Sequence, residues 1–229
     1  MDTERKSILG YAAIILAVVA LRAGLELFPV DHPQARQSLL QWKEILLLAA
    51  MGLAALRLAP RAGFADLWDR RVGAVGRFVV PLGLGAAFAA LTAGESLLHH
   101  WPNFHVPFPQ SVFVYGSAAV LYEVKYHLLP VVLVVWLAYD LGAGARWGRA
   151  WFWTVAVLLS LYEPLHQVPA MVRMGMVSGS PWVAASFAKI FLASLVPLYL
   201  FRRSGFLALV GFRFATYMLW HVLWPAVYF

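Results

Sequence analysis

Apolar and polar positions alternate on a long scale along this chain. Runs of about 20 mostly apolar residues are separated by short stretches that hold most of the charged residues, and no run shows the two-residue alternation of a strand. A run of this length crosses the hydrocarbon core of a bilayer as a helix. The pattern therefore predicts seven transmembrane helices, at roughly 7–29, 38–58, 77–98, 112–138, 150–168, 182–201 and 205–228.

The stretch 59–76 is too rich in charge to cross a membrane. Its apolar residues Phe64, Leu67, Trp68 and Val72 are spaced so that they could share one face of a short helix. We expect that helix to lie in the membrane interface.

The composition agrees with lipid as the solvent, because 62% of the residues are hydrophobic and only 13% are charged. Inside a bilayer every backbone polar group must be satisfied within a helix or a closed barrel. The expected fold is therefore all-α, a polytopic bundle of about seven spans that forms one membrane domain over residues 1–229. Residues 1–110 would hold the N-terminal helices and the interfacial segment, and residues 111–229 the functional core.

The net charge of +7 would suggest a nucleic-acid partner in a soluble protein, but here it follows the loops. Eleven lysines and arginines fall in the N-terminal segment and in every second loop, whereas the alternate loops hold only Arg36 and Arg173. By the positive-inside rule the N-terminus is cytoplasmic and the C-terminus lies outside. The expected partners include membrane lipid and exclude nucleic acid.

The chain has no cysteine, so its chemistry must come from carboxylates, histidines, tyrosines and hydroxyls. A charge at the bilayer centre costs about 2.5–3.5 kcal/mol on insertion scales, so each one needs a partner or a purpose. Glu95, His99, His100 and His105 cluster near the end of the third span, where we expect a polar rim or an entrance.

The C-terminal half carries ionisable residues in the middle of predicted helices. The i,i+4 spacing of Glu123 and His127 and the i,i+3 spacing of Glu163 and His166 put each pair on one helix face, and His221 lies in the last span. These five residues could hold a divalent metal such as zinc, or a water between a carboxylate base and histidine donors. They could equally form a structural hydrogen-bond network between helices.

The order of these motifs resembles the CAAX protease and bacteriocin-processing (CPBP) family of intramembrane proteases. That family has a helix with EExxxR, a later helix with FxxxH and a last helix with HxxxN or HxxxD. The matching segments here are Tyr122-Glu123-Val-Lys-Tyr-His127, Tyr162-Glu163-Pro-Leu-His166 and His221-Val-Leu-Trp-Pro225. The resemblance covers residues 111–229.

The resemblance implies that His166 and His221 position water or stabilise an oxyanion, and that Glu123 belongs to the catalytic group. The chain departs from the pattern because Tyr122 stands at the first glutamate, which activates water in active members, and Pro225 stands at the final Asn or Asp. Glu163, one turn from His166, is then a candidate replacement base. The accessory candidates are Tyr122, His127 and Tyr162.

Three functions are consistent with these residues. The first is a CPBP-type intramembrane endopeptidase, which hydrolyses a peptide bond of a membrane-associated or lipidated substrate with a water activated by glutamate and histidine. The second is an inactive relative that binds a membrane partner or a lipid. The third is a metal-binding membrane enzyme of another class. For each we expect an integral protein of a prokaryotic plasma membrane.

Overall fold

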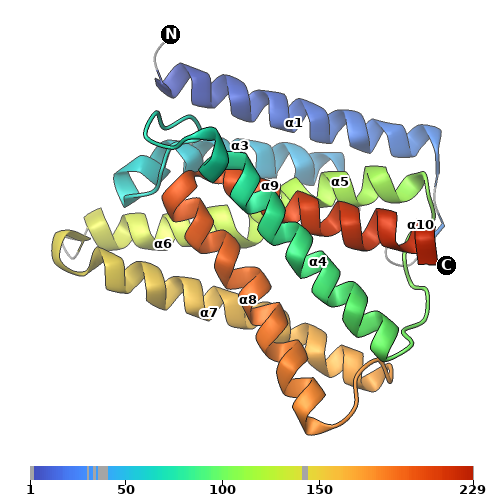
Figure 1. Ribbon diagram of the computed structural model, residues 1–229. Coiled ribbons are helices and arrows are strands. Elements are labelled where there is room, and N and C mark those ends of the chain that lie inside the picture. Colours follow the sequence, from blue (N-terminus) through green and yellow to red (C-terminus); the bar gives the residue numbers. More distant parts are fainter. Residues whose placement is uncertain (1–2, 30, 33–34, 36–40, 141–143, 229) are drawn as a thin grey trace.

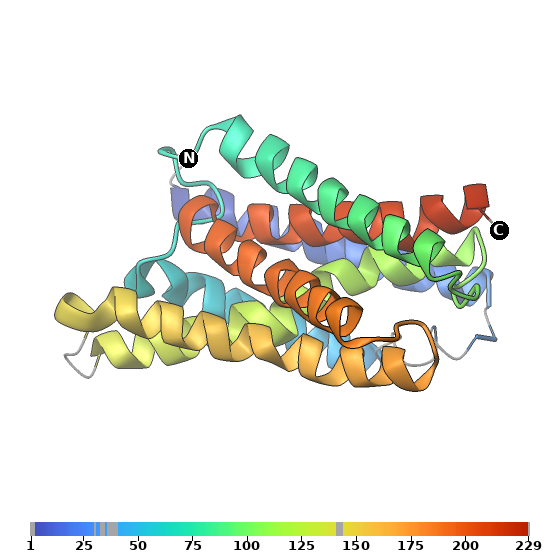
Figure 2. The ribbon, with the colours of Figure 1, turned by 60° about the horizontal axis from the view of Figure 1, so that its bottom comes forward.

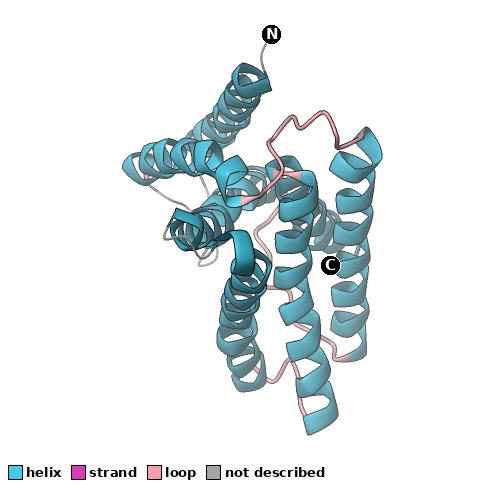
Figure 3. Cartoon of the chain, turned by 90° about the vertical axis from the view of Figure 1, so that its left-hand side faces the viewer, coloured by secondary structure: helices cyan, strands magenta, loops and turns pink. Residues whose placement is uncertain are grey.

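The computed structural model describes residues 3–29, 31–32, 35, 41–140 and 144–228 (Figure 1). Its main helices are α1 (Thr3–Leu27), α3 (Trp42–Leu58), α4 (Val80–Leu98), α5 (Gln110–Glu123), α6 (Leu129–Asp140), α7 (Gly144–Arg173), α8 (Ser180–Ser204), α9 (Phe206–Tyr217) and α10 (Trp224–Tyr228). Shorter helical turns are the 3-10 helix η1 (Ala59–Ala62) and the π-helices η2 (Val75–Val79), η3 (Val124–Leu128) and η4 (Met218–Leu223). Figure 3 shows only helices and loops in the described part of the chain.

Seven helical segments of the described chain are long and apolar enough to cross a membrane, which confirms the predicted all-α architecture. They are Glu4–Leu27, Trp42–Ala62, Val75–Leu98, Gln110–Asp140, Trp147–Arg173, Ser180–Ser204 and Phe206–Tyr228. Residues 38–40 of the second predicted span lie outside the described residues. The fourth and seventh spans each contain a π-helical segment, η3 and η4, between two α-helical parts.

The outer surface of the bundle is apolar. Leu16, Leu46, Leu91 and Leu158 expose 59–67% of their surface. Water would disfavour such a surface, whereas lipid tails accept it. Because lipid is as apolar as leucine, burial of apolar side chains contributes little to helix association, and close packing and polar contacts must hold the helices together.

Helix α9 lies at the centre of the bundle, in contact with α4, α5 and α8. Its residues Phe206, Leu209 and Phe212 are fully buried. Helix α4 comes so close that a Cβ on Gly85 would lie 2.3 Å from the carbonyl oxygen of Phe212. Helices α4 and α8 run obliquely across one side of the bundle (Figure 1 and Figure 2).

A tight turn joins α8 to α9 at Gly205, which has a φ of +84°. A Cβ at this position would lie 2.6 Å from the carbonyl oxygen of Asp66. Only glycine meets both demands without strain. This turn sets the position of α9, which carries the buried Arg213.

The prediction of an interfacial helix in 59–76 is wrong. The chain makes only η1 and a series of turns before η2 begins at Val75. Phe64 and Leu67 are buried in the bundle, 5% and 0% exposed, and Phe64 stacks on Phe201 with ring centroids 4.7 Å apart. The apolar residues of this segment therefore pack inward on the helices rather than outward on lipid.

Candidate functional site

An arginine in the last span is the centre of a buried polar cluster. Arg213 of α9 is 4% exposed, and its Nε donates a hydrogen bond to Oε1 of Glu123 at 2.5 Å. Its Nη1 lies 3.6 Å from Oε1 of Glu163. One buried guanidinium from α9 therefore faces buried carboxylates from α5 and α7.

Glu123 has a second partner on its own helix. Nδ1 of His127 lies 2.5 Å from Oε2 of Glu123, with Glu123 0% exposed and His127 2% exposed. Since a carboxylate accepts and does not donate, the proton of this bond is on Nδ1 of the histidine. The contact agrees with the i,i+4 spacing in the sequence, and both oxygens of Glu123 are occupied.

Glu163 is satisfied by two hydroxyl groups from neighbouring helices. The hydroxyl of Tyr122 donates to Oε1 and the hydroxyl of Ser194 donates to Oε2. Glu163 is 6% exposed and Ser194 is fully buried. Helices α5, α7 and α8 are thus tied together at one carboxylate, and α9 adds Arg213.

Aromatic rings enclose the guanidinium. The Cζ of Arg213 lies 4.6 Å from the ring centroid of Tyr122 and 5.6 Å from that of Tyr217. Such cation–π contacts are worth about 2 kcal/mol when the cation is desolvated. Removing one partner of a buried ion pair costs about 3–5 kcal/mol, because the other charge is left unpaired. The cluster therefore makes the relative position of four helices specific.

His221 lies at the edge of this cluster, because its ring is 5.3 Å from that of Tyr217, which borders the guanidinium of Arg213. Its Nδ1 is 3.1 Å from Nδ1 of His105, and its ring stacks on that of Tyr115 at 4.1 Å between centroids. One imidazole must donate and the other accept, so at least one of them is neutral. His221 was expected to help bind water, but its nearest polar partner is the loop residue His105.

His166 lies outside the cluster. It lies on the exposed side of α7, where its Nδ1 donates to the carbonyl oxygen of Tyr162 at 2.9 Å. Tyr162 is 49% exposed, and the two rings are 4.3 Å apart at their centroids. These two motif residues therefore belong to the outer surface of the bundle at membrane depth.

The outer surface near His166 carries further polar groups, which we call the outer polar strip: Lys125, Tyr126, Tyr162 and His166. Lys125 is exposed, and its Nζ lies 5.0 Å from the ring centroid of Tyr126. The ring of Tyr126 stacks on that of Tyr162 at 5.9 Å. The strip therefore runs from η3 to α7 across two adjacent spans.

The structure thus brings together part of the predicted constellation. Glu123, His127, Glu163 and Tyr122 lie in or beside one cluster, whereas His166 and Tyr162 lie on the strip and His221 lies beside His105. No group of three or more histidine, aspartate or glutamate side chains in the described chain is arranged to hold a metal ion. The carboxylates of Glu123 and Glu163 face the guanidinium of Arg213 instead.

Sequence reasoning missed Arg213 and Ser194. The signal for Arg213 was present, since a lone arginine in an otherwise apolar last span must have a partner. It also lies four residues before Tyr217 and eight before His221, on one helix face. Ser194 had no such signal, because serine is common in membrane helices.

A second ion pair lies near the expected polar rim. Lys189 Nζ and the hydroxyl of Ser186, both on α8, donate to the two carboxylate oxygens of Glu95 on α4. The side chains of Lys189 and Glu95 are 15% and 10% exposed. Glu95 is thus a helix-pairing residue, and of the predicted rim only His105 contacts a predicted site residue.

Comparison with protein-family models, with curated proteins and with solved structures finds no match to this chain. What the chain does must therefore be argued from its own residues.

Proposed function

We propose that this protein binds a membrane-spanning partner helix through the outer polar strip and does not hydrolyse it. The observation that carries the proposal is Lys125. It is the middle residue of the span Gln110–Asp140, and its side chain is exposed on the outside of the bundle.

An exposed lysine at this depth faces hydrocarbon in a lone molecule. Polar residues of membrane helices almost always face a bundle interior or a water-filled cavity, because lipid cannot solvate them. A partner helix with an aspartate or glutamate at mid-membrane would neutralise Lys125. Tyr162 and His166 would then offer hydrogen-bonding groups along the same contact.

The buried cluster supports this role by fixing the strip. Tyr122 donates to Glu163 inside the bundle, and its ring lies 4.6 Å from the ring of Tyr126 on the strip. The ion pairs of Arg213 thus hold α5 and α7 in the arrangement in which Tyr126 of η3 stacks on Tyr162 of α7. A polar network of this kind is an expected way to make helix packing specific.

The same cluster argues against hydrolysis. A general base must reach a water and be free to accept its proton. Glu123 is 0% exposed and accepts from Arg213 and His127, while Glu163 accepts from two hydroxyls. In the described chain no hydrogen bond joins either carboxylate to His221, whose Nδ1 faces His105.

A CPBP-type endopeptidase is the second candidate, favoured by the position of His166. A helix docked on the strip would lie beside His166 and within one helical turn of Glu163. In that reaction Glu163 would take a proton from water, the oxygen would add to the scissile carbonyl, and His166 would stabilise the oxyanion. The amine would leave with a proton returned by Glu163.

We also propose that the chain lies in a prokaryotic plasma membrane with its N-terminus in the cytoplasm and its C-terminus outside. Seven spans put the termini at opposite ends of the bundle (Figure 1), and the lysine and arginine excess is in the loops at the N-terminal end. A reporter enzyme that is active only outside the cytoplasm, fused after Phe229, tests this orientation.

The binding proposal is tested by site-specific photocrosslinking in membranes. A photoreactive amino acid replaces Tyr162 on the strip, and the matched control replaces Leu91, which is 59% exposed on α4. We expect an adduct with one membrane protein from position 162 alone, lost in Lys125→Glu and restored when a carboxylate of that partner is changed to lysine. Adducts that are equal at both positions, or insensitive to residue 125, would overturn the proposal.

The same membranes separate binding from cleavage. A non-hydrolytic protein leaves the partner intact in the wild type and in Glu163→Gln. If the partner is cleaved at a single bond, and cleavage stops in Glu163→Gln and His166→Ala while the adduct persists, the protein is an endopeptidase.

A further inference from the structure

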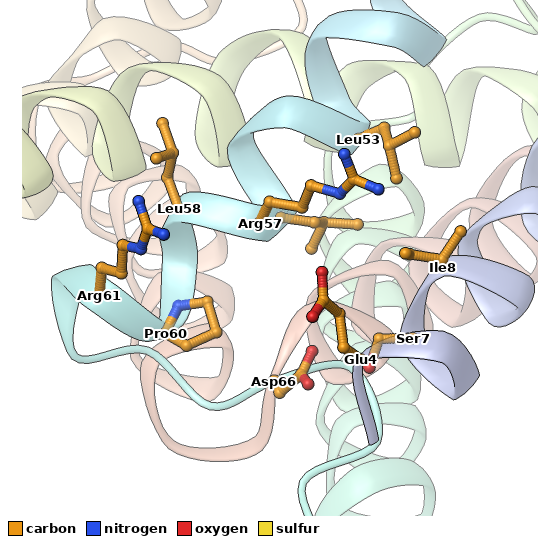
Figure 4. A pocket seen from close by; sticks show the side chains of 10 residues that line it. Glu4, Ser7, Ile8, Leu53, Arg57, Leu58, Pro60, Arg61 and Asp66 are labelled. Carbon is orange, nitrogen blue, oxygen red and sulfur yellow. The ribbon is translucent and has the colours of Figure 1, made fainter. Parts of the chain in front are cut away.

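A cavity lies in the N-terminal part of the chain, between the first and second spans. Its volume is about 560 Å³, and it is bounded by the first turns of α1, the end of α3 with η1, and the loop that follows. Figure 4 shows the charged side chains around it: Glu4 from α1, Arg57 from α3, Arg61 from η1 and Asp66 from the loop. None of these residues belongs to the cluster or to the strip.

The charges of this cavity differ from those of the Arg213 cluster. In the described part of the chain the side chains of Glu4, Arg57 and Arg61 form no ion pair or hydrogen bond, and all three residues are exposed. The carboxylate of Asp66 accepts only the backbone N–H of Leu67, at 2.7 Å. Two cations and two anions therefore surround one space.

A buried hydroxyl points to a ligand. Ser7 is 8% exposed and lines the cavity, yet its Oγ has no hydrogen-bond partner. Leaving a buried polar group unsatisfied costs about 1–3 kcal/mol. A ligand in the cavity would remove this cost if the Ser7 side chain rotated so that its hydroxyl met a hydrogen-bonding group of the ligand.

The depth of the cavity indicates what that ligand is. Glu4 is the first residue of one span, and Arg57 and Arg61 lie in the last turns of the next, so the cavity is at the level where lipid headgroups lie. Ile8 and Leu53, about one turn deeper in their spans than Glu4 and Arg57, also line the cavity. A headgroup can thus occupy the cavity while its acyl chains continue along α1 and α3.

We propose that this cavity binds a phospholipid whose headgroup carries both a phosphate and a primary ammonium, that is, a phosphoethanolamine lipid. Arg57 and Arg61 would hold the phosphate, as guanidinium groups do, with Ser7 as a further donor. Glu4 and Asp66 would accept hydrogen bonds from the ammonium. This binding is independent of the partner helix proposed for the strip.

The mixed charge is what selects the headgroup. A phosphoglycerol lipid satisfies the arginines but brings nothing for the two carboxylates. A phosphocholine lipid brings a positive charge, yet its trimethylammonium has no N–H to donate. Both lipids are therefore expected to bind more weakly than the ethanolamine lipid.

Native mass spectrometry of the full-length protein, stripped of lipid in detergent, measures this selectivity. Phosphoethanolamine, phosphoglycerol and phosphocholine lipids with the same acyl chains are titrated separately. We expect the ethanolamine lipid to bind about tenfold more tightly than either of the others, equivalent to about 1.4 kcal/mol. Equal binding of all three would mean ordinary surface lipid and would overturn the proposal, as would tightest binding of the phosphoglycerol lipid.

Variants assign the contacts. Arg57→Gln with Arg61→Gln should abolish the preferred binding, and Glu4→Gln should remove the preference for ethanolamine over glycerol while some binding persists. The matched control is Arg70→Gln, an exposed arginine of the same loop region that does not line the cavity. If the cavity variants bind as the control does, the site is elsewhere and the proposal fails.

Two further measurements control for misfolding and distinguish binding of the whole phosphoethanolamine headgroup from binding of a free phosphate ion. Ser7→Ala should raise the melting temperature of the lipid-free protein, because it removes an unsatisfied hydroxyl, and should weaken lipid binding. Soluble phosphoethanolamine should compete for the cavity at high concentration, whereas inorganic phosphate should not. Competition by phosphate alone would reduce the cavity to an anion site and contradict the ammonium contacts.

Discussion

The Arg213 cluster and the outer polar strip lie on the same helices at similar membrane depth, yet they are opposites. In the cluster, Glu123 and Glu163 face Arg213 and have further donors, and none of the three exceeds 6% exposure. On the strip, Lys125 is exposed, lies beside the aromatic ring of Tyr126 and makes no ion pair within the described residues.

The difference teaches how to interpret polar groups in a membrane protein. Charges that satisfy one another inside the bundle make helix packing specific, and they leave little capacity for chemistry. A charge that is exposed to lipid is unfavourable in the isolated chain, so it indicates contact with something outside it. Measurements of the free energy of unfolding distinguish the two kinds of charge. Substitutions in the cluster should lower this free energy, and substitutions on the strip should leave it nearly unchanged.

The largest expected effect is that of Arg213→Gln. It removes the guanidinium that two buried carboxylates share, and we expect a loss of about 3–5 kcal/mol in the free energy of unfolding. Denaturant unfolding of the purified protein in detergent measures it, with Arg70→Gln as the control for loss of one arginine. A loss below 1 kcal/mol would mean that the cluster does not hold the helices.

Adding Glu123→Gln to Arg213→Gln sharpens this result. Because the double variant removes one carboxylate together with the guanidinium, it should recover part of the lost stability. If the two losses simply add, Glu123 and Arg213 do not interact.

The next effect concerns the pair formed by His105 and His221. Burial, with the neighbouring His32 as a further cause, lowers the pKa of His105 from 6.5 to about 4, so the folded state resists its protonation. Stability is therefore full above pH 6.5 and falls by about 2–3 kcal/mol as the pH drops towards 4. Unfolding measured from pH 8 to 4 should show this fall in the wild type and much less of it in His105→Gln.

The control for that profile is His100→Asn, since His100 is exposed and has a φ of 51° that asparagine accepts. An unchanged profile in His105→Gln would assign the acid sensitivity to other groups.

A smaller effect is expected for Ser194→Ala. It removes a hydroxyl that donates to Glu163, and hydrogen bonds to charged groups contribute about 1.5–3 kcal/mol. The matched control is Ser160→Ala in α7, where an equally buried hydroxyl has no partner. Its loss should leave stability unchanged or raise it, so equal losses in both variants would reflect cavities alone.

The smallest effect belongs to Lys125→Leu. Its side chain is exposed and makes no ion pair in the described chain, so the free energy of unfolding should change by less than about 0.5 kcal/mol. The same variant should abolish the crosslink from position 162. A large loss of stability would instead make Lys125 part of the fold.

Much of the architecture could be predicted because membrane helices have a strong local signal. All seven spans follow from runs of apolar residues, and the pairing of Glu123 with His127 follows from helix geometry. The segment 59–76 could not be predicted in this way. Its apolar residues fit an amphipathic helix, but Phe64 and Leu67 have a larger apolar contact available on the bundle.

The candidate site was predicted only in part, because motif order says nothing about which face of a helix points inward. Glu163 and His166 are three residues apart, yet the first is buried and the second is exposed. Within three residues, side chains of this helix change from facing the bundle interior to facing outward. Ser194 entered the site without any local signal.

By itself the sequence determined the solvent, the number and length of the helices and the short-range pairs along each of them, because these depend on local hydrophobicity and helical periodicity. Only the tertiary structure decided that Arg213 bridges Glu123 and Glu163, that His221 pairs with His105 and that Lys125 faces outward. The pairs Arg213–Glu123 and His221–His105 join residues 90 and 116 positions apart, and the outward position of Lys125 depends on the rotation of its helix. Rotation and pairing are set by the packing of all the helices together, which no single segment encodes.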